Sequence, residues 1–124
     1  MECRIGRDPR NRKRFACLSN PSGGKAAVTR YRELRRFNGY SLVSLRPQTG
    51  RTHQLRVHLA HLGCPVAGDP IYGRRRSPYG LMLHAYRLRI RLPGEERPRT
   101  FRAPLPERFR RFLGAATGSP PGTG

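Results

Sequence analysis

Residues 27–47 read AVTRYRELRRFNGYSLVSLRP. Asn38-Gly39 lies between two runs in which apolar residues are interleaved with polar ones. An Asn-Gly pair in that position is the strongest short signal for a β-hairpin, because a type I′ turn needs a positive φ at both residues. We therefore predict strands over about residues 27–37 and 40–47, although residues 33–36 are also compatible with a helix.

A helix is expected after this hairpin. It begins at Thr52 or His53 and runs to Leu62, because Gly63 can cap its C-terminus. Its leucines recur at i, i+4 and i+7 and predict one buried stripe: Leu55, Leu59 and Leu62. A second face carries polar residues: Gln54, His58 and His61.

The flanking segments predict the rest of an α+β fold. Residues 81–93, LMLHAYRLRIRLP, read as a strand with Leu88, Ile90 and Leu92 inward, and residues 99–106 pair back in extended form. A short helix begins at Pro106, with Phe109, Phe112 and Leu113 inward. Residues 1–25 are basic, show little apolar periodicity and end in a loop. We expect a largely antiparallel mixed sheet with a few helices over residues 1–113, followed by a disordered tail at 114–124.

The charge of the chain points to a polyanionic partner. Its 124 residues include 26 Lys and Arg against 7 Asp and Glu, which gives a net charge of +19. Only Lys13 and Lys25 are lysines, and arginine can fork onto phosphate and stack on bases, which lysine cannot. Nucleic acid, RNA in particular, is the leading partner class. The alternative is that an arginine-rich genome places arginine at solvent-exposed positions in general. That alternative does not explain why the chain has only 7 acidic residues.

The distribution of apolar residues indicates the compartment of the protein. No apolar run is long enough to span a membrane and no signal-peptide core is present, so we expect a cytoplasmic protein with no membrane partner.

The chain has three cysteines, an odd number, which are widely spaced and form no CxxC pair: Cys3, Cys17 and Cys64. They predict neither a disulfide framework nor a zinc site, but free thiols, with Cys64 partly buried.

The side chains best suited to bind a ligand are concentrated at the start of the expected central helix. Free N–H groups and a partial positive charge at a helix N-terminus attract anions, and five side chains there add charge or hydrogen bonds: Arg51, Thr52, His53, Gln54 and Arg56. Arg56 adjoins the predicted buried stripe, where an arginine is costly unless a phosphate or a carboxylate meets it. The alternative is a solvated surface arginine. His58 and His61 could share an ion, but no acidic or cysteine ligand is near in sequence, so we expect no metal site.

These residues carry a family resemblance. Residues 45–73, LRPQTGRTHQLRVHLAHLGCPVAGDPIYG, are similar to the third conserved motif of the RluA-type pseudouridine synthases. Four other segments resemble the family in its own order: RIGRDPRNRKRF, GGKAAVTRYREL, LMLHAYRLRIRLP and FRAPLPERF. The resemblance covers roughly residues 4 to 113 and implies the C-terminal part of that family's catalytic domain.

The resemblance implies a reaction and roles for single residues. The family isomerises uridine to pseudouridine in RNA without a cofactor, using an aspartate from an upstream motif like HRLDRxTSG and a tyrosine that stacks on the base. Neither motif occurs in these 124 residues. Arg56 matches the arginine that pairs with that aspartate, and Leu55 matches the residue lining the uracil pocket. Arg51, Thr52 and His53 match the loop expected to touch ribosomal or transfer RNA, with Gln54 beside them.

The missing aspartate leaves several hypotheses open. None of the acids in the chain has the motif of a nucleophile, so we expect Arg56 to lack its partner and the chain alone to be inactive. The chain is then a truncated synthase, or one half of a split enzyme whose separate upstream polypeptide brings the aspartate. The alternatives are a catalytically inactive RNA-binding protein, consistent with the charge of +19, and a fragment without function.

Overall fold

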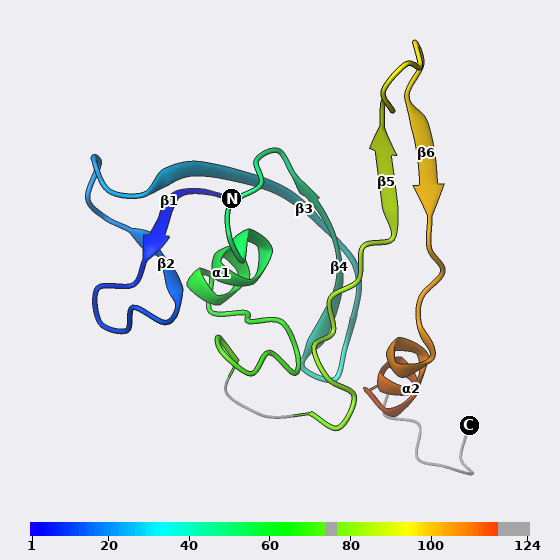
Figure 1. Ribbon diagram of the computed structural model, residues 1–124. Helices are drawn as coiled ribbons and strands as arrows, with labels where there is room; N and C mark the ends of the chain where they lie inside the picture. Colours follow the sequence, from blue (N-terminus) through cyan, green and yellow to red (C-terminus); the bar gives the residue numbers. More distant parts are fainter. Residues whose placement is uncertain (74–76, 117–124) are drawn as a thin grey trace.

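The computed structural model describes residues 1–73 and 77–116. Its elements, in chain order, are β1 (Glu2–Arg7), β2 (Phe15–Leu18), β3 (Lys25–Phe37), β4 (Tyr40–Pro47), α1 (Gln54–His61), β5 (Arg87–Ile90), β6 (Arg99–Arg102) and α2 (Glu107–Ala116). A four-stranded antiparallel sheet has the order β2-β1-β3-β4, and β5 and β6 form a separate antiparallel pair (Figure 1). The predicted α+β class is confirmed.

The β3–β4 hairpin forms where the Asn-Gly pair predicts it. Asn38 and Gly39 have φ values of 41° and 79°, as a type I′ turn requires. The register runs from Phe37 opposite Tyr40 to Thr29 opposite Pro47, with a bulge after Glu33. The helical alternative for residues 33–36 is therefore excluded.

Strands β1 and β2 lie in the segment for which the sequence pattern predicts no element. Each is short, and arginines in and around β1 mask an alternation in which Cys3 and Ile5 face the core. Cys17 on β2 lies opposite Ile5, so it shares that face. Two brief strands with few apolar residues give too weak a period to read from the sequence alone.

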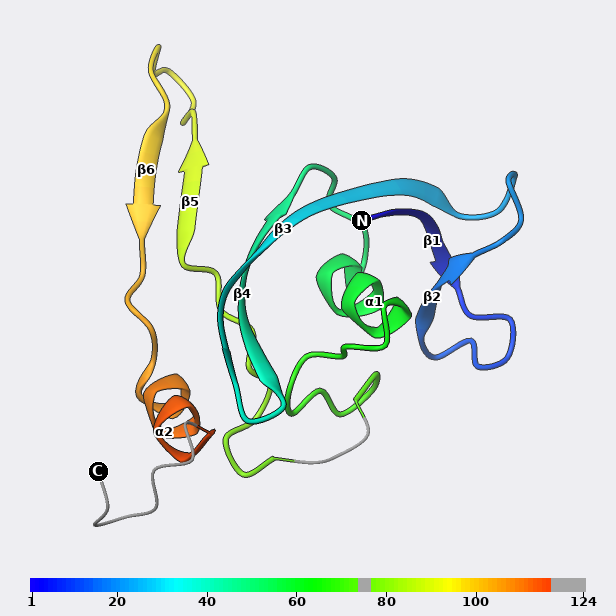
Figure 2. The same ribbon diagram turned by 180° about the vertical axis from the view of Figure 1, so that it is seen from behind.

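Helix α1 lies in the concave face of the curved sheet, as Figures 1 and 2 show from opposite sides. The core cluster beneath it consists of Ile5, Ala27, Val57 and Tyr72. The predicted leucine stripe is wrong. Leu62 is 49% exposed and Leu55 and Leu59 are half-buried, whereas the buried residues of the helix are Gln54, Val57 and His58.

The polar side chains of α1 are buried because the sheet offers them partners. Thr29 on β3 is fully buried, and its hydroxyl lies within hydrogen-bonding distance of both Gln54 and His58. A buried polar group costs little when it is hydrogen-bonded, so a polar stripe can replace an apolar one. The predicted helix itself is confirmed, with its C-terminal Gly63 at a φ of 79°.

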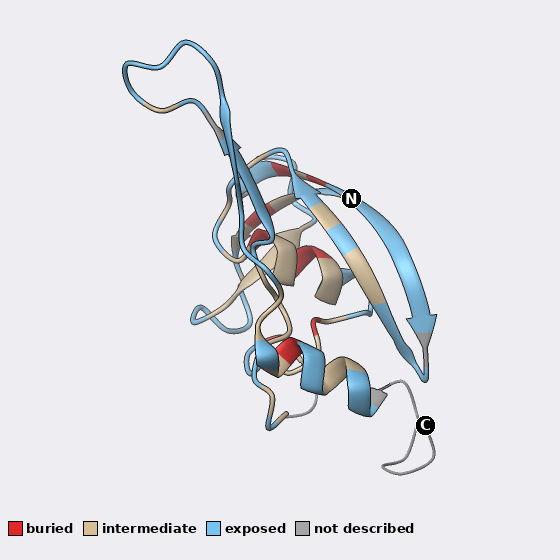
Figure 3. Ribbon diagram, turned by 90° about the vertical axis from the view of Figure 1, so that its right-hand side faces the viewer, coloured by how far each residue is buried: buried red, intermediate tan, exposed pale blue. Residues whose placement is uncertain are grey.

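The β5–β6 hairpin extends away from the sheet and is largely exposed (Figure 3). The predicted pairing of these segments is confirmed, but β5 is shorter than predicted. Of its predicted inward residues, Leu92 is half-buried and the side chain of Ile90 lies outside what the structure describes. Leu88 is 53% exposed and its cross-strand partner Phe101 is 42% exposed. No element of the described chain covers this face.

Helix α2 starts just after Pro106, and its inward residue is Phe109, which is 7% exposed. Phe112, half-buried, meets the ring of Tyr40 edge-on at 5.1 Å between centroids, which joins α2 to the tip of the β3–β4 hairpin. The helix includes residues 114–116 of the predicted tail, and the rest of that tail lies outside the described residues. No described helix is both long and apolar enough to cross a membrane.

Candidate functional site

The start of α1 is fastened to the sheet by Gln54. Its side-chain oxygen accepts hydrogen bonds from the Thr49 hydroxyl at 2.7 Å and the Arg51 backbone N–H at 3.0 Å. Its side-chain nitrogen donates to the Val28 carbonyl and the Thr29 hydroxyl, both at 2.9 Å. Gln54 is 4% exposed. All four hydrogen bonds are internal, so this residue holds the helix start in place rather than offering a donor to a ligand.

His53 precedes the helix in a conformation rare for residues other than glycine. Its φ and ψ are 52° and 23°, in the left-handed region, which costs about 1 kcal/mol or more for such a residue. The strain is offset by Tyr72, whose hydroxyl lies 2.9 Å from His53 Nδ1. Residues held in this region concentrate at functional sites.

The proton on His53 can be placed from its neighbours. The Tyr72 hydroxyl accepts the backbone N–H of Phe15 at 3.0 Å and can donate its own hydrogen to His53 Nδ1. In that arrangement the ring hydrogen lies on Nε2. Burial, and next the charge of Arg56, lower the pKa of His53 more than the charge of Asp69 raises it. The lowered pKa favours the neutral ring, in which Nε2–H can act as a donor.

Arg56 has a carboxylate partner within the chain, and this partner is Asp69 rather than the aspartate of the upstream motif that the resemblance implies. Its Nε and Nη2 atoms donate to the two carboxylate oxygens of Asp69 at 2.8 and 2.7 Å. The side chain of Arg56 is 14% exposed and that of Asp69 is 0% exposed. This two-pronged ion pair joins α1 to the turn that follows it.

Asp69 is saturated with donors. Besides Arg56, the backbone N–H groups of Ile71 and Tyr72 donate to its Oδ1 at 2.9 and 3.1 Å. Burial alone would raise the pKa of Asp69, but these hydrogen bonds, Arg56 first, outweigh it and hold the pKa below its ordinary value. A carboxylate so occupied is a structural anion and is not free to act as a nucleophile.

Tyr72 joins these groups into one cluster. Its ring is 7% exposed, and the guanidinium carbons of Arg14 and Arg56 each lie 5.2 Å from its centroid. His53 meets the same ring edge-on at 5.7 Å. Two cations on one aromatic ring help to fix its position, and the charge of each is balanced by an aspartate, Asp8 for Arg14 and Asp69 for Arg56.

The remaining predicted residues differ in what they present to solvent. Thr52 is exposed. Arg51 is half-buried and donates from Nε to the Ala26 carbonyl at 2.8 Å, and Leu55 is half-buried beside it on the first turn of α1. The structure thus gathers the predicted residues at one helix start but divides them into an accessible group and an internal one.

Other described acids are also engaged. Four more carboxylates stand in ion pairs within 3.6 Å: Asp8 with Arg14, Glu33 with Arg36, Glu95 with Arg99 and Glu107 with Arg111. Of these four carboxylates, only Asp8 is connected to the cluster around Arg56 and Tyr72, through its ion pair with Arg14. The described chain therefore offers no unpaired carboxylate in this cluster.

Comparison with known proteins matches this arrangement to a family. The family model described as RNA pseudouridylate synthase matches residues 3–61, which include all of β1 but its first residue, together with β2, β3, β4 and α1. An uncharacterised RNA pseudouridine synthase of Chloroflexus aurantiacus is 49% identical over 109 residues, covering 86% of this chain and 34% of that protein. Ribosomal large subunit pseudouridine synthase D of Borreliella burgdorferi is 45% identical over 116 residues, covering 91% and 35%.

A solved structure agrees. Human RNA pseudouridylate synthase domain containing 1 superimposes with a TM-score of 0.70 at 29% identity, over 96% of this chain and 59% of that one. This chain belongs to the RluA-type pseudouridine synthase family. The chain spans about a third of the length of the two curated RluA-type relatives named above.

Two residues that organise this cluster are not among the predicted site residues. Asp69 and Tyr72 both lie in GDPIYG, where Pro70 and two glycines predict only a turn. A signal for Asp69 was present, since an arginine beside a buried helix face needs an anion and Asp69 is the next acid along the chain. Tyr72 had no such signal, because its partners Arg14 and Phe15 come from a distant segment.

Proposed function

We propose that this chain is part of an enzyme that isomerises uridine to pseudouridine in RNA, and that it supplies the α1 side of the uridine pocket. The observation that carries the proposal is the family match over residues 3–61, which contain the strained helix start at His53. Ribosomal RNA is favoured over transfer RNA as substrate, because a relative at 45% identity is named for the ribosomal large subunit. The cytoplasm is the proposed compartment.

In this proposal the accessible residues of the helix start bind substrate. Thr52, Arg51 and the N–H of His53 contact the RNA backbone or the base, and Leu55 lines the apolar side of the pocket. Arg56 orients the catalytic aspartate. Its Nε and Nη2 are held by Asp69, and Nη1, which has no partner among the described residues, is the nitrogen that would reach a second carboxylate.

The nucleophile comes from a segment outside these 124 residues. The sequence holds no HRLDRxTSG motif, and Asp69 is occupied by Arg56 and two backbone N–H groups. That segment belongs either to a longer form of the protein or to a separate polypeptide. We expect the chain alone to bind RNA and to leave uridine unchanged.

A mixing experiment tests this. The DNA upstream of the Met1 codon is translated in three frames, and a polypeptide carrying an HRLD-type motif is purified and added to the chain with ribosomal RNA. Pseudouridine formation by the mixture, and its loss when Arg56 is replaced by Gln, is the expected result. Arg110→Gln, an exposed arginine on α2, is the matched control and should keep activity. A mixture without activity while each component binds RNA would reject the split-enzyme form.

An inactive RNA-binding protein is the second candidate, favoured by the net charge of +19. It predicts RNA binding with a salt dependence of about −0.7 in log–log slope per phosphate contacted on single strands. The two candidates separate at the upstream DNA. If no frame encodes an HRLD-type motif and RNA binding persists, the second candidate replaces the first.

A further inference from the structure

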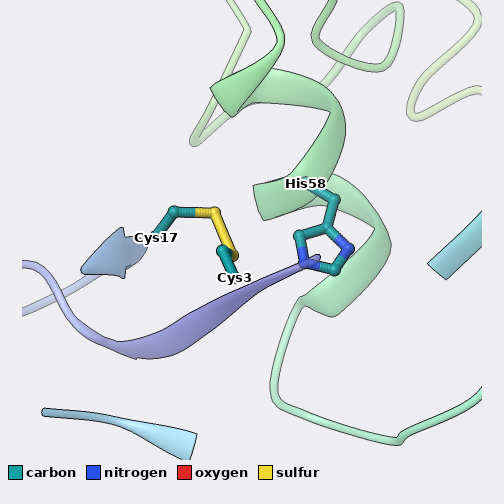
Figure 4. A group of neighbouring side chains, drawn as sticks. All are labelled: Cys3, Cys17 and His58. Atoms are coloured by element: carbon teal, nitrogen blue, oxygen red, sulfur yellow. A yellow bond between two sulfur atoms is a disulfide. The ribbon is translucent and has the colours of Figure 1, made fainter. Parts of the chain in front are cut away.

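Three side chains that are far apart in sequence meet beneath α1. Cys3 on β1, Cys17 on β2 and His58 on α1 each offer a ligand atom, and these atoms all lie within 4.8 Å of one another. The two sulfurs form a disulfide, with 5.6 Å between the Cα atoms. The prediction of free thiols is therefore wrong for this pair, whereas Cys64 is free and is exposed rather than partly buried. Figure 4 shows the imidazole pointing toward the sulfur pair.

His58 has an unused nitrogen at this place. It is 2% exposed, and its Nδ1 lies 2.7 Å from the Thr29 hydroxyl. Its Nε2 is buried and has no hydrogen-bond partner among the residues that the structure describes. Buried polar atoms are almost always hydrogen-bonded, so an orphaned nitrogen beside two sulfurs calls for an explanation. The disulfide does not provide one, because its sulfurs are weak acceptors.

We infer that the reduced Cys3–Cys17 pair and His58 form a binding site for one Zn²⁺ ion. Two thiolates and an imidazole are ligands that zinc prefers, at about 2.3 Å for sulfur and 2.0–2.1 Å for nitrogen. Ligand atoms around such an ion lie roughly 3.3–3.8 Å apart at tetrahedral angles, so the observed set needs only small side-chain rotations once the sulfurs separate. Cys3 and Cys17 are half-buried, and we expect a water molecule to complete the four ligands of the ion.

The hydrogen bonds around His58 suit a metal-bound imidazole. Metal-bound histidines usually donate their other ring N–H to an oxygen, which fixes the ring. Thr29 Oγ1 is that oxygen, and Gln54 Nε2 in turn donates to it at 2.9 Å. On zinc binding the ring hydrogen of His58 lies on Nδ1 and points at Thr29, and Nε2 gives its lone pair to the ion.

The disulfide and the metal exclude each other, because both use the same sulfur atoms. A phosphine reductant opens the site: with one water molecule it becomes the phosphine oxide, and Cys3 and Cys17 become two thiols. Zn²⁺ then replaces the two thiol protons, which pass to water. The resulting site carries no net charge, since two thiolates balance the ion, so it adds nothing to a chain whose net charge is already +19.

Zinc titration of the full chain tests the site. The chain is reduced with a phosphine, desalted without air, and titrated with Zn²⁺ against a chromophoric chelator. We expect one ion per chain, and no tight binding by the same protein left oxidised. Cys64→Ser is the matched control and should bind as the parent does. Cys3→Ser and Cys17→Ser should each bind at least about 100-fold more weakly, because removing even a residue that only hydrogen-bonds to a metal ligand costs about 10–100-fold.

His58→Gln is the third ligand variant, and its fold is checked by circular dichroism because His58 is buried. Co²⁺ provides a readout independent of affinity: sulfur-to-cobalt charge-transfer absorption should appear in the reduced parent and in Cys64→Ser. It should be absent from the Cys3→Ser/Cys17→Ser double variant. Zinc binding by that double variant as tight as the parent's, or no stoichiometric binding by the reduced parent, would overturn the inference.

Discussion

Asp69 is the residue on which the interpretation of this site depends. Its carboxylate is fully enclosed and accepts hydrogen bonds from Arg56 and from two backbone N–H groups. Removing one partner of a buried ion pair leaves the other charge uncompensated, which is far more costly than loss of an exposed pair. Asp69 therefore acts on stability and on the orientation of Arg56.

The first prediction concerns this pair. Asp69→Asn leaves Arg56 buried without a counter-charge and should lower the free energy of unfolding by about 3 kcal/mol, measured by urea denaturation. Glu107→Gln is the control, because its ion pair with Arg111 is largely exposed and should change stability by less than about 0.5 kcal/mol. Equal losses of unfolding free energy in the two variants would show that the Asp69–Arg56 pair stabilises the fold no more than an exposed ion pair does.

The second prediction is a pH dependence. The pKa of Asp69 in the folded chain lies below its ordinary value, so the unfolded chain binds the proton first as pH falls. The stabilisation by Asp69 is fully present above about pH 4 and is lost as pH falls through the lower folded pKa. Urea midpoints measured from pH 6 downward should fall less steeply in Asp69→Asn than in the parent. If the urea midpoints of the two proteins fell in parallel with pH, Asp69 would make no contribution to the loss of stability in acid.

At the scale of elements, the hairpin turn and α1 were predictable because their signals are local. Asn38-Gly39 dictates the turn, and Gly63 ends the helix. The buried face of α1 was not, because Gln54 and His58 are buried by partners on β3 that lie 25 or more residues away. Hydrophobic periodicity cannot report a polar stripe whose partners are distant in sequence.

The third prediction tests the turn. Gly39 has a φ of 79° and open space where a Cβ would be, so Gly39→Ala meets backbone strain and no clash. It should destabilise the chain by about 1 kcal/mol. Gly50→Ala is the control, since Gly50 also has open space but no positive φ, and it should be neutral or slightly stabilising. The comparison is made by thermal unfolding, and equal shifts would argue against a type I′ turn.

At the scale of the whole molecule, the family was predictable, but the long-range clusters were not. The motif around Arg56 identifies the family from sequence alone. The Cys3–Cys17–His58 group and the Tyr72 cluster arise only when β1 and β2 fold against α1, and no spacing in the sequence encodes that meeting. The exposed apolar face of Leu88 and Phe101 likewise appears only in three dimensions.

The fourth prediction concerns how the molecule binds RNA. Arg87 and Arg102 face each other across the exposed β5–β6 hairpin, so removing both relieves repulsion and does not harm the fold. If the hairpin binds the RNA backbone, the Arg87→Gln/Arg102→Gln variant should flatten the log–log salt dependence by about 0.7 for each phosphate that it no longer neutralises. Thr100→Ala on the same hairpin should leave the slope unchanged. An unaltered slope in the double variant would place the RNA elsewhere on the chain.

The measurement that tests the central claim most directly is the pseudouridine content of ribosomal RNA incubated with the purified 124-residue chain alone. The Arg56–Asp69 pair leaves no free carboxylate in the cluster, so we expect RNA to bind and every uridine to stay unchanged. Pseudouridine formed by the chain alone, and lost in Asp69→Asn under conditions where that variant stays folded, would contradict the claim and make Asp69 the nucleophile.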